Sequence, residues 1–247
     1  MKTIKRVLIK LSGGALASKE GGSFDHQKLE HIADEILSIT SMEIEVALVI
    51  GGGNIFRGGL AEKWNIDRVE ADNIGTLGTI MNSLMLRGVL KSKTDKEIRV
   101  MTSIPVPSVA EPYIQLRAKR HLEKGSIVIF GGGNGQPFVT TDYPSVQRAI
   151  ETDCDAIFVA KQGVDGVFDY DPNQHANAKM YRTLNYDDIL KENIKVMDQS
   201  ALLLAKEFDI AVNIFNFDKQ GEMKRIVEGK QVGTVVSKDS TEFYVTS

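Results

Sequence analysis

The sequence predicts a three-layer α/β fold, in which a mainly parallel sheet is covered by helices on both faces. Short apolar runs that barely alternate recur along the chain, as is typical of buried parallel strands. Amphipathic segments with helical spacing lie between these runs, and three of the four glycine clusters directly follow an apolar run. Because strands and helices alternate throughout, we expect right-handed crossovers and a parallel sheet.

The first half of the chain carries the clearest pattern. A helix is predicted between the first two strands, because five apolar residues share one helical face: Leu29, Ile32, Ala33, Ile36 and Leu37. The same spacing predicts a long helix before a strand near Val100, from Leu77, Ile80, Met81, Leu84 and Met85. The apolar face of this long helix also suits a subunit contact. The other strand candidates are residues 7–9, 46–50, 127–130, 156–159 and 210–215.

Capping and turn residues predict the later elements. Thr141-Asp142 offers a helix cap with Pro144 soon after, and residues 199–208 are rich in the helix formers alanine and leucine. Residues 164–172 are rich in turn residues and predict a hairpin or a loop excursion. No linker or repeat divides the chain, so we expect one domain over residues 1–247 with two lobes that meet near residues 150–160.

Composition and charge narrow the classes of function. The 247 residues hold 30 Lys and Arg against 33 Asp and Glu, so no bulk positive field draws the protein to nucleic acid or anionic lipid. The lone Cys154 has no partner for an internal disulfide, and a reducing cytoplasm is the expected location. Lys10 interrupts the N-terminal apolar run, and no stretch approaches the roughly 20 apolar residues that span a bilayer. We therefore expect neither export nor membrane insertion.

The glycine clusters, at residues 13–14, 51–53, 58–59 and 131–133, predict a phosphate site. Ligands of open α/β sheets bind beyond the carboxyl ends of the strands, and glycine turns there let backbone N–H groups converge on an anion. A tight turn with close helix packing explains any one glycine pair as well, but three clusters at equivalent strand ends favour phosphate. Neither a Walker A loop nor a Gly-x-Gly-x-x-Gly fingerprint after the first strand occurs.

Three charged residues stand beside these turns. Lys10 ends the first strand and projects a cation toward the crevice, although strand-end lysines are usually solvated. Arg57 either grips a phosphate with two guanidinium N–H groups or is an exposed arginine at a helix start. Asp72, in the first turns of the long helix, either accepts hydrogen bonds from ribose hydroxyls or stabilises that helix N-terminus as an anion.

Amides and hydroxyls follow the third glycine cluster over residues 134–142. They suit recognition of a base edge and a phosphate together, whereas the alternative is a capped βα loop, for which Thr-Thr-Asp is adequate. No nucleophile elbow or zinc-binding cysteine pair occurs, and the four histidines are expected on the solvated surface. Phosphoryl transfer fits this absence, because positioning and charge neutralisation catalyse it and a phosphate acceptor needs no general base.

Five motifs follow one another along the chain: Lys-Leu-Ser-Gly at 10–13, Gly-Gly-Gly-Asn-x-x-Arg-Gly at 51–58, Pro-Phe-Val-Thr-Thr-Asp at 137–142, Val-Asp-Gly-Val-Phe at 164–168 with Asp171-Pro172, and Lys-Val-Met-Asp at 195–198. With them, residues 5 to 237 resemble the bacterial UMP kinase family of the amino acid kinase superfamily. The first motif is shared across the superfamily, whereas the second combined with Thr-Thr-Asp is much more specific. The resemblance implies transfer of the γ-phosphoryl group of ATP to UMP, giving UDP and ADP in pyrimidine nucleotide biosynthesis.

The resemblance also implies an acceptor-binding N-terminal lobe, an ATP-binding C-terminal lobe and the residues of each site. Lys10 is implied as the main charge stabiliser and Arg57 as the group that reaches the transferred phosphate, so these two are the catalytic candidates. The implied ATP-binding residues are Lys10, Leu11, Ser12, Gly13, Gly53, Arg57, Gln162, Phe168 and Asp171. The implied UMP-binding residues are Gly52, Asp72 on the ribose, Asn134, Gly135, Gln136, Pro137, Phe138, Val139, Thr140, and Thr141 near the phosphate.

Cofactors and partners follow from the same resemblance. Mg²⁺ is expected on the nucleotide phosphates of ATP, without a protein metal site, and Lys161 matches the position of a second cation. A homohexamer and an allosteric GTP or UTP are also implied. Three departures from the family pattern stand out: Gly14 replaces a usual glutamate, residues 133–136 replace a usual Thr-Gly-Asn-Pro approach, and residues 18–23 occupy the GTP-activation region without its usual residues.

Two other functions compete with UMP phosphorylation. One keeps the superfamily and changes the acceptor to a carboxylate or carbamate, as in acetylglutamate, aspartate, glutamate or carbamate kinases. Arg57 and the Thr140-Thr141-Asp142 loop argue against that acceptor. The other is a nucleotide-sensing or storage protein with the same cleft and no turnover, and the presence of Lys10 argues for catalysis instead.

Overall fold

The computed structural model describes residues 3–18, 21–175 and 177–245, and a single ten-stranded sheet runs through it. The strands are β1 Arg6–Leu11, β2 Glu45–Ile50, β3 Ile98–Thr102, β4 Glu111–Pro112, β5 Ile127–Gly131, β6 Ala156–Lys161, β7 Tyr181–Asn185, β8 Ala211–Asn216, β9 Thr234–Ser237 and β10 Glu242–Phe243. Their order in the sheet is β10-β7-β9-β8-β6-β1-β2-β5-β3-β4, and every pairing is parallel except β8 with β9 and β10 with β7. The prediction of a mainly parallel sheet is confirmed.

The middle strands are buried on both sides, which explains why their sequences barely alternate. In β1, Val7, Leu8 and Ile9 are fully buried, although adjacent residues face opposite sides of the sheet. Every predicted apolar run became a strand with one or two residues added or shifted at its ends. The short strands β4, β7, β9 and β10 were not predicted.

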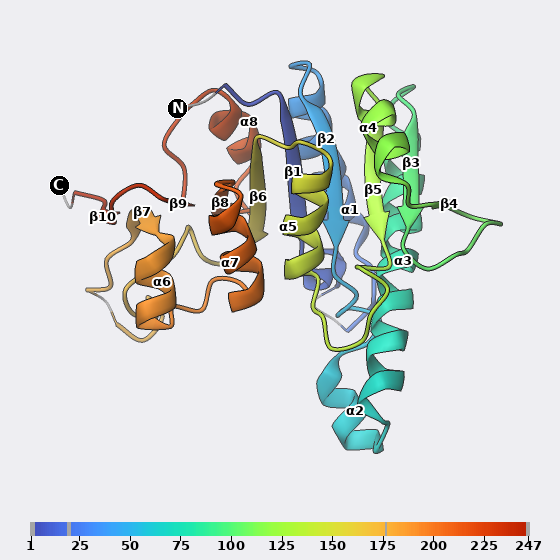
Figure 1. Cartoon of the computed structure of the whole chain (residues 1–247), viewed down its shortest axis with the longest axis horizontal. Coiled ribbons are helices and arrows are strands. Elements are labelled where there is room, and N and C mark those ends of the chain that lie inside the picture. The colour runs from blue at the N-terminus through green and yellow to red at the C-terminus, as the bar shows by residue number, and fades with distance from the viewer. Residues whose placement is uncertain (1–2, 19–20, 176, 246–247) are drawn as a thin grey trace.

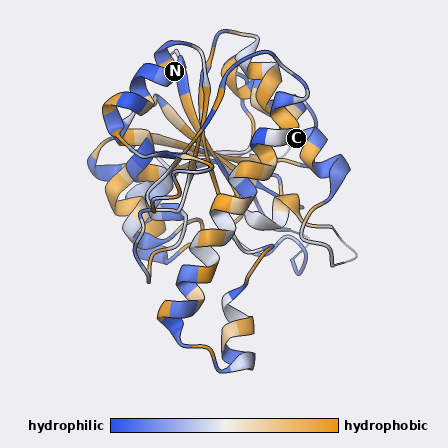
Figure 2. Cartoon of the chain, turned by 90° about the vertical axis from the view of Figure 1, so that its right-hand side faces the viewer, coloured by the Kyte–Doolittle hydropathy of each residue, from blue (hydrophilic) through white to orange (hydrophobic). Residues whose placement is uncertain are grey.

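Helices cover both faces of the sheet and complete the three layers (Figure 1). They are α1 His26–Thr40, α2 Gly58–Trp64, α3 Arg68–Lys91, α4 Gln115–Glu123, α5 Asp142–Glu151, α6 Tyr186–Glu192, α7 Gln199–Glu207 and α8 Glu222–Val227, with a short 3₁₀ turn at Gly13–Leu16. The apolar sides of α1, α3 and α8 pack on one face, and those of α4, α5, α6 and α7 pack on the other. Figure 2 shows the apolar strands at the centre of the molecule. None of the helices within the described ranges is long and apolar enough to cross a membrane.

The predicted apolar face of α3 is only partly buried. Ile80 is 4% exposed, whereas Leu77, Met81 and Met85 are 50%, 51% and 38% exposed. The first half of α3 projects beyond the sheet together with α2, as both views show (Figures 1 and 2). The predicted helix is confirmed, and Leu77, Met81 and Met85 form an exposed apolar stripe along it.

Three smaller predictions need correction or detail. Helix α5 begins where expected, but Thr141 makes no side-chain cap, and the hydroxyl of Thr140 accepts the N–H of Asp142 instead, at 3.1 Å. Residues 164–172 form a loop, with one antiparallel bridge between Phe168 and Met180. The histidines are not all solvated, because two are partly buried and paired: Nε2 of His31 lies 2.7 Å from the carbonyl of Phe217, and Nε2 of His121 lies 3.1 Å from the carboxylate of Glu111.

Candidate functional site

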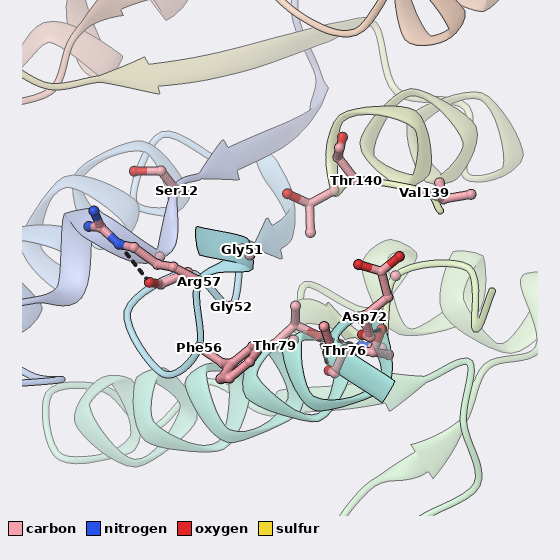
Figure 3. Close-up of a pocket in the computed structure, with 18 of the residues that line it drawn as sticks. Ser12, Gly51, Gly52, Phe56, Arg57, Asp72, Thr76, Thr79, Val139 and Thr140 are labelled. Carbon is pink, nitrogen blue, oxygen red and sulfur yellow. Dashed lines mark hydrogen bonds between the residues drawn. The ribbon is translucent and has the colours of Figure 1, made fainter. Parts of the chain in front are cut away.

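A cleft of about 410 Å³ opens where the glycine turns after β1, β2 and β5 meet (Figure 3). Twelve of the predicted site residues line it: Lys10, Ser12, Gly13, Gly52, Gly53, Arg57, Asp72, Asn134, Gln136, Val139, Thr140 and Thr141. The lining also includes Gly51 of the predicted glycine cluster and residues that were not predicted, among them Phe56, Gly75, Thr76 and Thr79. Parallel strands end at one edge of the sheet, and this brings turns about 40 and 80 residues apart in sequence into one site.

The turns after β1 and β2 touch each other. A Cβ atom added to Gly13 would lie 2.6 Å from the backbone nitrogen of Gly53 and 2.8 Å from the carbonyl oxygen of Gly51. No side chain fits at that separation, so glycine at position 13 is required by the close approach. The two turns therefore present their backbone groups to one shared space, which is the arrangement that binds a chain of phosphates.

Helix α3 holds the turns after β2 and β5 in place. The fully buried amide of Asn82 donates to the carbonyl of Gly51 at 2.7 Å and exchanges hydrogen bonds with the amide of Asn54. One turn earlier, the hydroxyl of Thr79 accepts the N–H of Gly132 at 2.8 Å. Sequence reasoning missed both residues, and the available signal was polar side chains on the side of the helix that faces the sheet.

Positive charge gathers at the base of the cleft. Nζ of Lys10 lies 2.6 Å from Oδ1 of Asp142, and both side chains are mostly buried. Oδ2 of Asp142 accepts the N–H of Asp198 at 3.0 Å. On β6, which pairs with β1, Lys161 donates to the carbonyl of Val196 at 3.1 Å. Burial lowers the pKa of Lys161, and the positive charge of Lys10 lowers it further, while Asp142 opposes both. Asp142 was predicted as part of a helix cap and of the Thr-Thr-Asp motif, but not as the partner of Lys10.

Arg57 lies at the same end of the cleft as Ser12 in Figure 3. Its Nε donates to the carbonyl of Gly53 at 3.0 Å, and this hydrogen bond holds the guanidinium against the turn after β2. A Cβ atom added to Gly14 would lie 4.0 Å from Nη2 of Arg57, 4.0 Å from Oε1 of Gln162 and 3.8 Å from Oγ of Ser12. Three polar side chains thus lie near position 14, and Gln162 borders this end of the cleft without lining it.

The opposite end of the cleft holds Asp72, well separated from Arg57 in Figure 3. Nε of Arg68 donates to both carboxylate oxygens of Asp72, at 3.0 and 2.9 Å. The N–H of Phe138 donates to Oδ2 of the same carboxylate at 2.8 Å. The guanidinium carbon of Arg68 lies 5.8 Å from the centre of the Phe138 ring. One carboxylate therefore joins the start of α3 to the loop after β5.

Seven predicted site residues lie outside the lining of the cleft: Leu11, Gly135, Pro137, Phe138, Gln162, Phe168 and Asp171. Leu11 is fully buried in β1 and can offer only its backbone. Asp171 accepts the N–H of Asn173 in an exposed turn of the 164–172 loop. Residues 19 and 20 of the segment predicted at 18–23 lie outside the described residues, as does residue 176 beyond that loop.

The chemistry available in the cleft is that of phosphate binding. Backbone groups of two glycine turns, the ammonium of Lys10 and the guanidinium of Arg57 surround one end. Within the described residues, no group of three or more His, Cys, Asp or Glu side chains is placed to hold a metal ion. The arrangement can neutralise transferred negative charge directly, with positioned cations and N–H donors.

Comparisons with known proteins agree with this geometry. The model described as the amino acid kinase family matches residues 5–216. A protein from Frankia alni named uridylate kinase is 52% identical over 236 residues, which cover 96% of this chain and 92% of that protein. A second protein of that name, from Frankia casuarinae, is 51% identical over 237 residues, with the same two coverages.

Two solved structures share the whole architecture. The crystal structure of UMP kinase from Bacillus anthracis has a TM-score of 0.97 at 67% identity, covering 99% of this chain and 100% of that chain. The crystal structure of UMP kinase from Ureaplasma parvum has a TM-score of 0.90 at 36% identity, covering 96% and 100%. The three-layer arrangement around the cleft is therefore shared with both.

Proposed function

The chain belongs to the amino acid kinase family, and we propose that it is an enzyme that transfers the γ-phosphoryl group of ATP to UMP, giving UDP and ADP. The observation that carries this proposal is the division of the cleft: Lys10 and Arg57 stand at the end framed by glycine turns, and Asp72 stands at the other. Cations suit the phosphates, and a carboxylate suits the hydroxyls of a ribose. The reaction supplies UDP for pyrimidine nucleotide biosynthesis.

The two nucleotides then meet phosphate to phosphate. An oxygen of the UMP phosphate forms a bond to the γ-phosphorus of ATP as the bond to the β-phosphate breaks, and its electron pair leaves on ADP. The acceptor phosphate is already deprotonated, so the site needs charge neutralisation rather than a general base. Lys10, held by Asp142 at 2.6 Å, and Arg57, held by the carbonyl of Gly53, are fixed before the substrates bind.

The site residues divide between the substrates as the family pattern implies. We assign the ATP phosphates to Lys10, the 11–13 turn, Gly53 and Arg57, and the adenine nucleotide to Gln162, Phe168 and Asp171. We assign UMP to Gly52, Asp72 and residues 134–141. The structure supports the ATP-phosphate and Asp72 assignments through the cleft lining, whereas Phe168 and Asp171 lie on a loop beyond it. The N-terminal lobe would then bind the acceptor and the phosphates of ATP, and the C-terminal lobe the rest of the adenine nucleotide.

Mg²⁺ is the cofactor we propose, bound to the phosphates of ATP. The residues fit a metal that arrives with the nucleotide, because the phosphate end of the cleft offers cations and backbone groups, and its nearest carboxylate, Asp142, is paired with Lys10. The metal would neutralise phosphate charge when bound. Excess EDTA should abolish ADP formation, and added Mg²⁺ should restore it. Turnover that persists in excess EDTA would contradict a metal requirement.

A homohexamer in the cytoplasm completes the proposal. The exposed stripe Leu77, Met81 and Met85 on α3 supports a subunit contact, because three large apolar side chains at helical spacing are costly to leave in water. The lone Cys154 and the nucleotide substrates fit a reducing compartment.

We also propose that GTP or UTP regulates turnover. A second cleft of about 470 Å³ supports this, since Arg87 and Lys91 line it and can meet phosphate charge, beside Arg99, which is paired with the lining carboxylates Glu97 and Glu111. Titration of each nucleotide into an assay with fixed ATP and UMP measures the response. Rates of ADP release that do not change with GTP or with UTP would contradict regulation by these nucleotides, but not the proposed reaction.

The direct test is release of ADP with ATP and Mg²⁺ against a panel of acceptors: UMP, CMP, AMP, acetylglutamate, aspartate, glutamate and carbamate. Turnover with UMP alone is the expected result. Turnover only with a carboxylate or carbamate would agree with the family but contradict UMP as the acceptor. If no acceptor in the panel supports ADP release and the protein still binds UTP, it is a nucleotide-binding protein without turnover.

A further inference from the structure

The carboxylate of Asp72 is held from two sides by groups outside the phosphate end of the cleft. On its own helix, Nε of Arg68 reaches both of its oxygens at 3.0 and 2.9 Å, one helical turn earlier. From the loop after β5, the N–H of Phe138 reaches Oδ2 at 2.8 Å. The side chain of Asp72 is 24% exposed, and its remaining surface faces the cleft.

Phe138 is held in an unusual backbone conformation at this contact. Its φ of 65° lies in the left-handed region, which residues other than glycine, asparagine and aspartate rarely adopt. Its ring is 66% exposed, so burial in a core does not explain the conformation. The hydrogen bond to Asp72 and the guanidinium of Arg68 beside its ring are the contacts that oppose a return to ordinary φ.

We propose that Arg68 is a positioning residue for the acceptor nucleotide: it fixes the carboxylate of Asp72 and the loop at Phe138, so that Asp72 meets the ribose of the acceptor in one orientation. This inference rests on the proposed function, because it needs a ribonucleotide at that end of the cleft. A carboxylate offers about four lone-pair positions. Arg68 uses one position on each oxygen and the N–H of Phe138 uses the second on Oδ2, so one position on Oδ1 remains for a hydroxyl donor.

The proposal distinguishes ribose from 2′-deoxyribose. A site built to accept hydrogen bonds from hydroxyls loses affinity for an acceptor that lacks one of them, because a buried acceptor atom is left without its donor. That discrimination depends on the orientation of the carboxylate. If Arg68 is removed, only the N–H of Phe138 still holds the carboxylate of Asp72, so its orientation is less fixed and the difference between the two sugars should shrink.

The experiment measures kcat and KM for UMP and for dUMP with saturating ATP and Mg²⁺. Arg68→Ala should raise KM for UMP about tenfold with kcat changed less than twofold, since a charge-assisted contact to the acceptor site is lost. The ratio of kcat/KM for UMP to that for dUMP should fall in the same variant. Arg68→Lys keeps the charge and should recover part of the loss. Lys63→Ala, which removes an exposed cation from the end of α2, is the matched control and should behave as wild type.

Two further variants separate the contacts. In a double-mutant cycle, Arg68→Ala should add little to Asp72→Asn, because Arg68 acts through that carboxylate. Phe138→Asn tolerates the left-handed backbone and keeps the N–H donor, so it removes only the ring and should raise KM for UMP less than Arg68→Ala does. Wild-type selectivity and KM in Arg68→Ala, or full additivity with Asp72→Asn, would overturn the inference. A wild-type protein that does not phosphorylate UMP would instead overturn the proposed function.

Discussion

Lys10 and Asp142 form an ion pair that lies mostly out of water, with side chains 12% and 15% exposed. Asp142 is itself fixed by the N–H of Asp198, so the ammonium of Lys10 is held in place at the end of β1. Such fixed charge stabilises a transition state without reorganisation at the moment of reaction. The neighbouring Lys161 adds a second cation whose pKa is lowered by burial and by Lys10.

Replacement of Lys10 tests the importance of this charge. Lys10→Ala should lower kcat by about a hundredfold or more, because one fixed electrostatic stabiliser is typically worth that. Lys5→Ala, an exposed lysine just before the same strand, is the control and should keep wild-type turnover. Circular dichroism checks that both variants fold, and near-normal kcat in a folded Lys10→Ala protein would contradict the assignment.

Cys154 provides a prediction about pH. Burial raises the pKa of the Cys154 thiol to about 12, so at pH 8 this thiol is protonated in the native protein. Iodoacetamide should therefore label the native chain at pH 8 far more slowly than the chain unfolded in guanidinium. The unfolded thiol ionises near 9.0 while the folded one stays protonated, so this group should lower the stability as pH rises from about 9 to about 12. Rapid labelling of the native protein would show that the thiol is accessible.

At the residue scale, the sequence predicted groups that stand beside glycine turns and missed those that act through a partner. Lys10, Arg57 and Asp72 were identified because each follows a strand or starts a helix near a cluster. In the sequence, Asp142 resembles a helix cap and Arg68 resembles an exposed helix residue. In the fold, Lys10 lies beside Asp142 and Phe138 lies beside Arg68. A pairing between residues more than 60 positions apart leaves no local pattern to detect.

Helix α3 does most of the positioning among the elements. Its hydrogen bonds hold the turns after β2 and β5 through Asn82 and Thr79, and its first turns carry Asp72. The helix also approaches the sheet closely at Gly52, where an added Cβ atom would lie 2.3 Å from the carbonyl oxygen of Gly75. Two backbones can approach this closely only because position 52 has no side chain.

A methyl group at that crossing should separate the helix from the turn. Gly52→Ala should destabilise the fold by about 1–3 kcal/mol, the usual cost of overpacking, and should raise KM for UMP because Asp72 moves with α3. Gly59→Ala in α2 is the control, since nothing lies within 4 Å of its added Cβ. Urea denaturation gives the free energies of unfolding, and equal stability of the two variants would show that α3 can shift freely.

The elements of the core were predictable for a physical reason. Buried parallel strands have continuous apolar runs, and the helices over them keep an apolar stripe, so β1, β2, β5, β6 and β8 were found from sequence alone. Strands β7, β9 and β10 lie at the edge of the sheet and are short, so their sequences mix polar and apolar residues. The stripe Leu77, Met81 and Met85 on α3 stays exposed among the described residues.

At the scale of the whole molecule, that exposed stripe predicts assembly. The protein should sediment with about six times the mass of its 27.2 kDa chain, and Met81→Glu should give smaller species, because a charge in an apolar contact is costly to bury. Leu203→Glu on α7, a leucine of similar exposure on the other face of the sheet, should leave the mass unchanged. A wild-type protein that sediments as a monomer would contradict the proposed hexamer.

The ten-stranded sheet has a consequence for how the molecule closes on its substrates. The lobe boundary predicted near residues 150–160 overlaps β6, yet β6 is paired in register with β1 over five residues. A rotation of one lobe against the other would break the backbone hydrogen bonds between β1 and β6 at the centre of the sheet. Closure therefore belongs to the segments beyond the sheet, α2 with the start of α3 and the loop after β5. In hydrogen exchange, amides of those segments should open often, while the amides of β1 and β6 exchange only when the whole chain unfolds.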